Sequence, residues 1–169
     1  MNNGNKNSGH AFFDSSGTAL IVLNFNKYYA QESHGSKNKD HDFQMAMANT
    51  DRLSRELKNA FPDLSQIWIT DHTYDSSPQS PDMSLSPVTN PLKETVASAF
   101  FNDNPDVYDH VMVSSYSNAF RGAIECETGK SLSAILAEKG INTVLIAGMS
   151  ASQAVLQTAT SARDADRKS

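Results

Sequence analysis

The sequence is poor in the features that define several large classes of protein. It contains a single cysteine, Cys126, so no disulfide can form within the chain and no cluster of thiolates can bind zinc. No apolar run approaches the roughly 20 residues that a membrane-spanning helix needs. The first residues, MNNGNKNSGHAFFDSS, lack the apolar stretch of a secretory signal. These absences favour a cytoplasmic protein.

Basic residues are also too few to outnumber the acidic ones. The chain has 14 Lys and Arg residues against 19 Asp and Glu residues, which gives a net charge of −5. Nucleic acids and anionic membranes attract surfaces with a surplus of positive charge. We therefore expect neither nucleic acid nor membrane as a partner, and we expect a small molecule or another protein instead.

The remaining composition is that of one globular domain. The chain has 169 residues, of which 38% are hydrophobic and 20% are charged, and domains of this size are common. Residues 1–17 are rich in Asn, Ser and Gly and are predicted to form a flexible N-terminal tail. Residues 18–169 are predicted to form the domain.

Short apolar runs alternate with helical patterns along this domain. The runs predict strands at 19–23, 67–70, 111–113 and 143–147, and the helical patterns lie at 43–61, 92–101, 131–139 and 152–164. Residues 30–41 and 73–91 are predicted loops, and Gly140 is a predicted left-handed helix cap. We expect the last helix to pack Val155, Ala159 and Ala162 on the sheet. Strands that alternate with helices predict an α/β fold with three layers, α/β/α, and a parallel sheet that binds ligands at its carboxyl edge.

Three segments of the chain carry a family resemblance. They are ALIVLNFNKYY at 19–29, VMVSSYSNAF at 111–120 and KGINTVLIAGMSASQAVLQTATSARD at 139–164. Over residues 18–163 the chain resembles the isochorismatase-like hydrolases, a superfamily that includes nicotinamidases and other cysteine-dependent amidases. The resemblance implies a Rossmann-like α/β/α fold with a parallel sheet.

The resemblance also implies where a catalytic triad would lie. In the superfamily an Asp ends the first strand, a Lys follows the third strand, and a nucleophilic Cys stands at a helix N-terminus. The corresponding residues of this chain are Asn24, Ser114 and Ala154. An amide cannot act as a general base, and a methyl group cannot form a thioester. We therefore predict a catalytically degenerate protein, a pseudoenzyme, that acts as a small-molecule-binding or protein-interaction module.

The same resemblance suggests residues that line a ligand pocket. Its members are uncharged and suit a small polar molecule, without a cofactor: Asn24, Asn26, Ser114, Phe120, Ser150 and Ala154. The alternative is an active hydrolase of amide or ester bonds with a relocated site, built from Ser150, Ser152, Asp71 and His72. Otherwise we expect the two serines to cap the last helix. Cys126 lies outside the register of the nucleophile, and we expect it to be inert.

Metal binding is a further alternative near the second strand. Nicotinamidase-like members carry an Asp-x-His zinc site there, whereas Asp71 and His72 are adjacent in this chain. Adjacent side chains on an extended segment point apart, so they are poorly placed to bind one ion. We predict no metal site, and we keep Asp71 and His72 as the candidates if one exists.

The last expectation concerns the edge of the sheet. Family members continue beyond the final helix with a further strand and helix, which this chain is expected to lack. Their absence would leave the strand at 143–147 as an apolar edge with unpaired backbone groups, and proteins cover such edges. We expect a second copy of the chain, another protein partner, a rearranged segment of the chain or the N-terminal tail to cover it.

Overall fold

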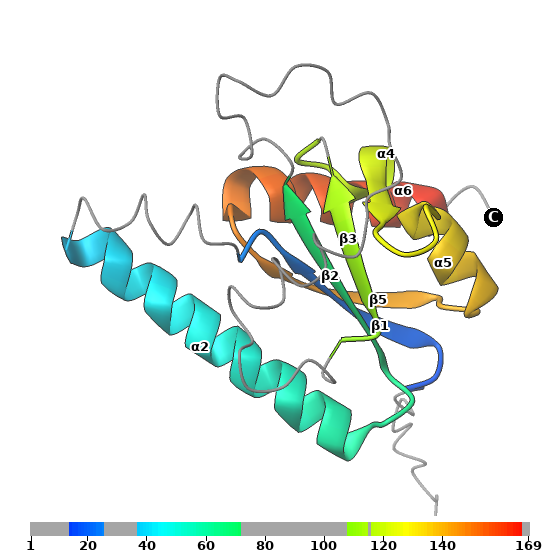
Figure 1. Ribbon diagram of the computed structural model, residues 1–169, viewed down its shortest axis with the longest axis horizontal. Helices are drawn as coiled ribbons and strands as arrows, with labels where there is room; N and C mark the ends of the chain where they lie inside the picture. The colour runs from blue at the N-terminus through cyan, green and yellow to red at the C-terminus, as the bar shows by residue number, and fades with distance from the viewer. Residues whose placement is uncertain (1–13, 26–36, 72–107, 115, 167–169) are drawn as a thin grey trace, which may run out of the picture.

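The computed structural model describes residues 14–25, 37–71, 108–114 and 116–166. Five strands form one sheet with the order β4-β3-β2-β1-β5 (Figure 1). Their bounds are Thr18–Leu23 for β1, Ser65–Asp71 for β2, His110–Ser114 for β3, Ala123–Glu125 for β4 and Thr143–Gly148 for β5. The four strands predicted from apolar runs are therefore confirmed, each lengthened by one to three residues. The predicted helix at 92–101 and the loop at 73–91 lie outside the described residues.

Four of the strands run parallel, as predicted. β1 pairs in parallel with β2 on one side and with β5 on the other, and β2 pairs in parallel with β3. The short β4, which the sequence analysis missed, pairs antiparallel with β3. Only the four-residue helix α4, Ala119–Gly122, lies between β3 and β4, and a parallel return needs a crossover of a dozen or more residues.

Helices cover both faces of the sheet and confirm the three-layer architecture. α2, Lys37–Ala60, lies on one face. On the other face lie α4, α5 (Leu132–Glu138), the π-helical turn η3 (Ala151–Val155) and α6 (Leu156–Asp166), as Figure 1 shows. Each face has its own buried core. Ala19, Ile21 and Leu23 of β1 point toward α4–α6, and Leu20 and Val22 point toward α2, as the alternation of a strand requires.

The structure tests three local predictions about the starts, ends and packing of the helices. α2 begins at Lys37, inside the predicted loop 30–41. Gly140 has φ +65°, which confirms the left-handed cap after α5. The predicted packing face of the last helix is confirmed at Val155, which packs against the buried core, and is wrong at Ala159, which is exposed, whereas Ala154 and Thr158 are buried. The N–H of Val155 donates to the carbonyl of Ser150, five residues earlier, so the first turn of the helix is wide. This wide turn places Ala154, the residue before Val155, against the sheet.

The strand β5 forms an edge of the sheet within the described residues. It pairs with β1 on one side, and Leu145 is 37% exposed. The predicted edge at 143–147 is therefore present in this part of the chain, while the partner predicted to cover it stays a prediction. None of the helices in the described ranges combines the length and apolar character of a membrane span.

Candidate functional site

The carboxyl ends of the four parallel strands meet at one edge of the sheet. In the register of the sheet, Leu23 lies beside Ile69 and Gly148, and Asp71 lies beside Ser114. The segments that follow these strand ends therefore share one region of the molecule. In parallel α/β sheets this edge is where ligands bind.

A close approach of two strands shapes this edge. Gly148 has φ +142°, and a side-chain Cβ at that position would lie 2.7 Å from both the Cβ and the backbone nitrogen of Leu23. Real Cβ atoms do not approach other atoms so closely, so the position requires glycine. The backbone N–H of Met149 then donates a 2.9 Å hydrogen bond to the carbonyl of Leu23. This bond holds the turn after β5 against the end of β1.

Asn24 directly follows this contact and is 5% exposed. Its φ of +60° lies in the left-handed region, which Asn tolerates better than most residues. Its backbone N–H donates a 2.8 Å hydrogen bond to the carbonyl of Ile69 in β2. Asn24 is thus fixed between the ends of β1 and β2, whereas Asn26 lies outside the described residues.

Ser150 stands at the turn between β5 and the final helix. It follows a cis peptide bond from Met149 and occupies the N-cap position of η3. Its carbonyl accepts 3.2 Å hydrogen bonds from the N–H groups of Gln153 and Val155, but its side chain makes no capping hydrogen bond. The expectation that this hydroxyl caps the helix is therefore wrong. Ser152 is exposed.

Ala154 lies in the first turn of the same helix and is 2% exposed. It belongs to the buried cluster that includes Leu23 and Ala119, and Phe120 packs against that cluster with a half-buried side chain. The methyl group of Ala154 is therefore enclosed by the ends of β1 and the start of α4. Among the described residues, the cluster around Ala154 is apolar and supplies no nucleophile.

Ser114 ends β3 and is 2% exposed. Its hydroxyl donates a 2.7 Å hydrogen bond to the carbonyl of Tyr116 and accepts a 3.2 Å bond from the N–H of the same residue. The side chain therefore closes a local turn after the strand. Its proton and one of its two lone pairs are engaged by the backbone.

Two polar residues that the sequence analysis did not select join this loop to the final helix. Asn118 caps α4 by accepting a 3.1 Å bond from the N–H of Phe120, and it donates a 2.8 Å bond to the hydroxyl of Ser161. The hydroxyl of Thr158, which is fully buried, accepts a 3.2 Å bond from the N–H of Ala119. An Asn before a short apolar segment is a capping signal that could have identified Asn118.

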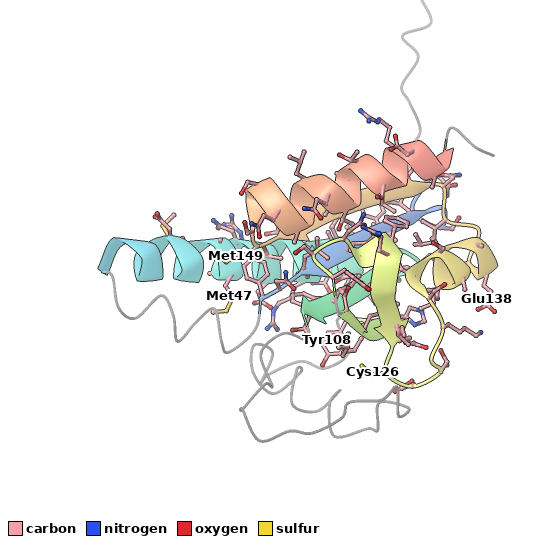
Figure 2. All side chains as sticks on the ribbon, turned by 90° about the horizontal axis from the view of Figure 1, so that it is seen from above. Met47, Tyr108, Cys126, Glu138 and Met149 are labelled. Atoms are coloured by element: carbon pink, nitrogen blue, oxygen red, sulfur yellow. The ribbon has the colours of Figure 1, made fainter. Side chains whose placement is uncertain are left out.

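The only thiol of the chain lies far from Ala154. Cys126 directly follows β4, at the opposite edge of the sheet from β5. Four strand spacings separate these edges, a distance of about 19 Å. Cys126 is 5% exposed and packs with Trp68 and Tyr108 in the core on the α2 side of the sheet. Figure 2 shows it at the opposite side of the molecule from α6.

A second polar group lies at the amino end of β3, away from the carboxyl edge. The Nδ1 atom of His110 is 2.5 Å from Oε1 of Glu125, and the hydroxyl of Thr128 donates to Oε2. Burial of Glu125 by itself raises the pKa of its carboxyl, but the hydrogen bonds from His110 and Thr128 outweigh it and lower the pKa below the ordinary 4.5. This group joins β3 to β4 and does not contribute to the edge that holds Ala154.

The metal candidates gain no further ligand from the described residues. Asp71 ends β2 beside Ser114, while His72 lies outside the described residues. The described ranges contain no group of three or more His, Cys, Asp or Glu side chains that could hold a metal ion. Asp71 and His72 as ligands therefore remain a prediction.

This architecture, a mostly parallel sheet with a helix that starts beside the end of β1, is that of the α/β cysteine hydrolases. The family model described as the isochorismatase domain matches residues 18–168. The chain belongs to the isochorismatase family. A search of curated proteins finds no match.

Solved structures of the same fold come from several hydrolases. An isochorismatase of Pseudomonas putida KT2440 is 19% identical over 91% of this chain and 67% of that chain, with a TM-score of 0.58. The N-carbamoylsarcosine amidase of Thermoplasma acidophilum is 18% identical over 88% of this chain and 77% of that chain, with a TM-score of 0.56. The nicotinamidase of Staphylococcus aureus is 18% identical over 89% and 78%, with a TM-score of 0.50. At these identities the likeness shows the shared fold.

Proposed function

We propose that this chain is a catalytically degenerate member of the isochorismatase family that binds a small, neutral, polar molecule at the carboxyl edge of its sheet. The observation that carries the proposal is the place of its single thiol. Cys126 follows β4, at the opposite edge of the sheet from β5, and is buried in the core on the α2 side, whereas Ala154 is buried in the core on the other side. The chain therefore has no sulfur atom at the helix that follows β5.

The chemistry of the corresponding residues supports the same proposal. By the family resemblance the base, the cation and the nucleophile are replaced by Asn24, Ser114 and Ala154. A carboxamide does not accept a proton near neutral pH, a hydroxyl carries no positive charge, and a methyl group does not attack a carbonyl carbon. The Ser114 hydroxyl is also held by the backbone of Tyr116.

The binding role rests on the uncharged character of the same edge. The proposed lining consists of amide, hydroxyl and apolar side chains: Asn24, Asn26, Ser114, Phe120, Ser150 and Ala154. Amide and hydroxyl groups donate and accept hydrogen bonds without favouring a charged ligand. The one buried thiol also suits a reducing compartment, which supports a cytoplasmic location.

The competing function is hydrolysis of amide or ester bonds by a relocated site. Ser150 favours it, because the hydroxyl makes no capping hydrogen bond and stands at a helix N-terminus. An activated serine needs a neighbouring base. His110 is the one histidine whose side chain is described, and it lies at the amino end of β3 in contact with Glu125. The sequence prediction names His72 as the base of such a site, with Asp71 to orient it.

An activity assay separates the two functions. Purified full-length protein would be incubated with nicotinamide, isochorismate and simple primary amides, and separately with a fluorophosphonate probe that labels activated serines. We expect no turnover above buffer and no covalent label. The Ser150→Ala variant has a matched control in Ser131→Ala, because Ser131 is an N-cap whose side chain does accept a bond, from the N–H of Ala134.

Turnover or labelling that Ser150→Ala abolishes and Ser131→Ala retains would establish the relocated hydrolase and overturn the proposal. Turnover lost in Cys126→Ala would overturn it by a different route. A contaminating hydrolase would be unaffected by all three substitutions. The binding role is tested by amide chemical shifts during titration with nicotinamide, where we expect changes at Asn24, Ser150 and Ala154. Changes confined to other regions would contradict the proposed site.

A further inference from the structure

A hollow lies along the outer side of β5, where the polar side chains of Asn142, Thr143 and Arg163 line it together with apolar ones. It has a volume of about 320 Å³ and is lined by β5 and α6, with Val144 and Ile146 on the strand and Ala159 and Ala162 on the helix. Ala159 is exposed although it lies on the helix face that the sequence pattern assigns to the sheet. The sheet edge and this helix face are thus apolar together.

The backbone of β5 shows which of its groups are unpaired. The N–H groups of Thr143 and Met149 bond the carbonyls of Gly17 and Leu23, at the two ends of the β1 pairing. Because backbone groups alternate in direction along a strand, the odd-numbered residues between them also face β1. The N–H and C=O groups of Val144 and Ile146 therefore point away from the sheet. Within the described residues no strand pairs with them.

We propose that this surface, which we call the β5 seam and define by Val144, Leu145, Ile146, Ala159 and Ala162, binds a second copy of the chain. A two-fold axis at Leu145 would join the two β5 strands in an antiparallel pair. Val144 then lies opposite Ile146 of the second copy, so the outward-facing groups of each residue meet a partner. The same axis brings the two α6 helices together along their small residues, which permit close helix packing.

The charge of the seam favours a second copy over a partner that must supply counter-charge. The chain carries a net charge of −5, so two copies repel one another in general. The residues that define the seam are uncharged, and Arg163 is the charged residue that borders the hollow. No carboxylate lines the hollow, so two identical seams can meet without opposing negative charges. Leu145 and the neighbouring apolar atoms then leave water on both copies.

The position of the axis gives a sharp test, because Leu145 of one copy would lie opposite Leu145 of the second copy. We expect sedimentation of the full chain at about 100 µM to give a dimer mass. Leu145→Lys should give a monomer, since it opposes two ammonium groups at the axis. Leu53→Lys is the matched control, because Leu53 on α2 is 40% exposed and Leu145 is 37% exposed. Mixing L145K with L145E should restore a dimer that neither variant forms alone.

Amide exchange of the unmodified protein provides a measurement that needs no variant. We expect the amides of Leu145 and Ala147 to exchange slowly because they face β1, and we expect those of Val144 and Ile146 to exchange slowly as well and to exchange faster on dilution. A monomer mass at high concentration would overturn the proposal, whether or not those amides are protected by another segment. A dimer that persists in L145K, or that L145K and L145E fail to restore when mixed, would overturn it as well.

Discussion

The backbone N–H of Ala119 donates a hydrogen bond to the hydroxyl of Thr158, 3.2 Å away, and the Thr158 side chain is fully buried. This bond joins α4, which follows β3, to α6, which follows β5. A backbone donor is thus satisfied in the core by a side chain from a distant part of the sequence. The two helices enclose the side of the carboxyl edge on which Ala154 lies.

Thr158→Val should therefore destabilise the protein beyond the effect of a change in packing. Valine preserves the shape of the side chain but leaves the Ala119 N–H without an acceptor, at a cost of about 1–3 kcal/mol. Thr158→Ser keeps the acceptor and loses one methyl group, which should cost about 1 kcal/mol. Free energies of unfolding from urea titration compare the two. A valine variant as stable as the unmodified protein would show that the bond contributes nothing.

Gly148 provides a second stability test with an internal control. In Gly148→Ala the new Cβ meets the backbone of Leu23, and the residue keeps a φ of +142°, so we expect a loss of about 3 kcal/mol or more. Gly140 also has a positive φ but has no atom within 4 Å of the added Cβ. Gly140→Ala should then cost only about 1–2 kcal/mol. Equal losses in the two variants would refute the close approach of β5 to β1.

Local sequence patterns predicted much of the fold because burial leaves a periodic signal. β1 reads as an unbroken apolar run and is buried at all six positions, as a central parallel strand should be. β4 has only three residues and no run of its own, so its pairing with β3 depends on the path of the chain. The packing of the last helix was mispredicted at Ala159 because Ala, Thr and Ser suit both burial and exposure, and the wide turn at Ala151–Val155 alters the helical register.

The candidate site was less accessible to sequence reasoning than the fold. The family resemblance identified Asn24, Ser114 and Ala154, and topology predicted only that the ligand site lies at the carboxyl edge of the parallel sheet. The engagement of Ser114 with Tyr116 and the uncapped hydroxyl of Ser150 depend on backbone angles at single turns. The contact between Asn118 and Ser161 spans 43 residues. No local pattern specifies such a pair.

The Glu125 carboxyl predicts a loss of stability in acid. Its pKa in the folded protein lies below the ordinary 4.5, because hydrogen bonds from His110 and Thr128 outweigh the effect of burial. The unfolded chain therefore binds the proton more readily, and the stabilisation present above 4.5 is lost as the pH falls through the lowered pKa. We expect Glu125→Gln to reduce the slope of unfolding free energy against pH between about pH 5 and pH 3. Glu138→Gln is the control, because Glu138 is an exposed partner of Lys130. An unchanged slope in Glu125→Gln would contradict the role of the pair.

Cys126 gives a prediction about reactivity that bears on the proposed function. A catalytic thiol must be accessible and must ionise near neutral pH, whereas Cys126 is 5% exposed in a core that includes Trp68 and Tyr108. Its reaction with a disulfide reagent should therefore proceed only through opening of the fold, and should be slowed by about 100-fold or more relative to the chain in urea. Cys126→Ala should show no reaction at all, since no other thiol exists. A native protein that reacts as fast as the unfolded chain would place an accessible thiol in the fold and reopen the case for cysteine chemistry.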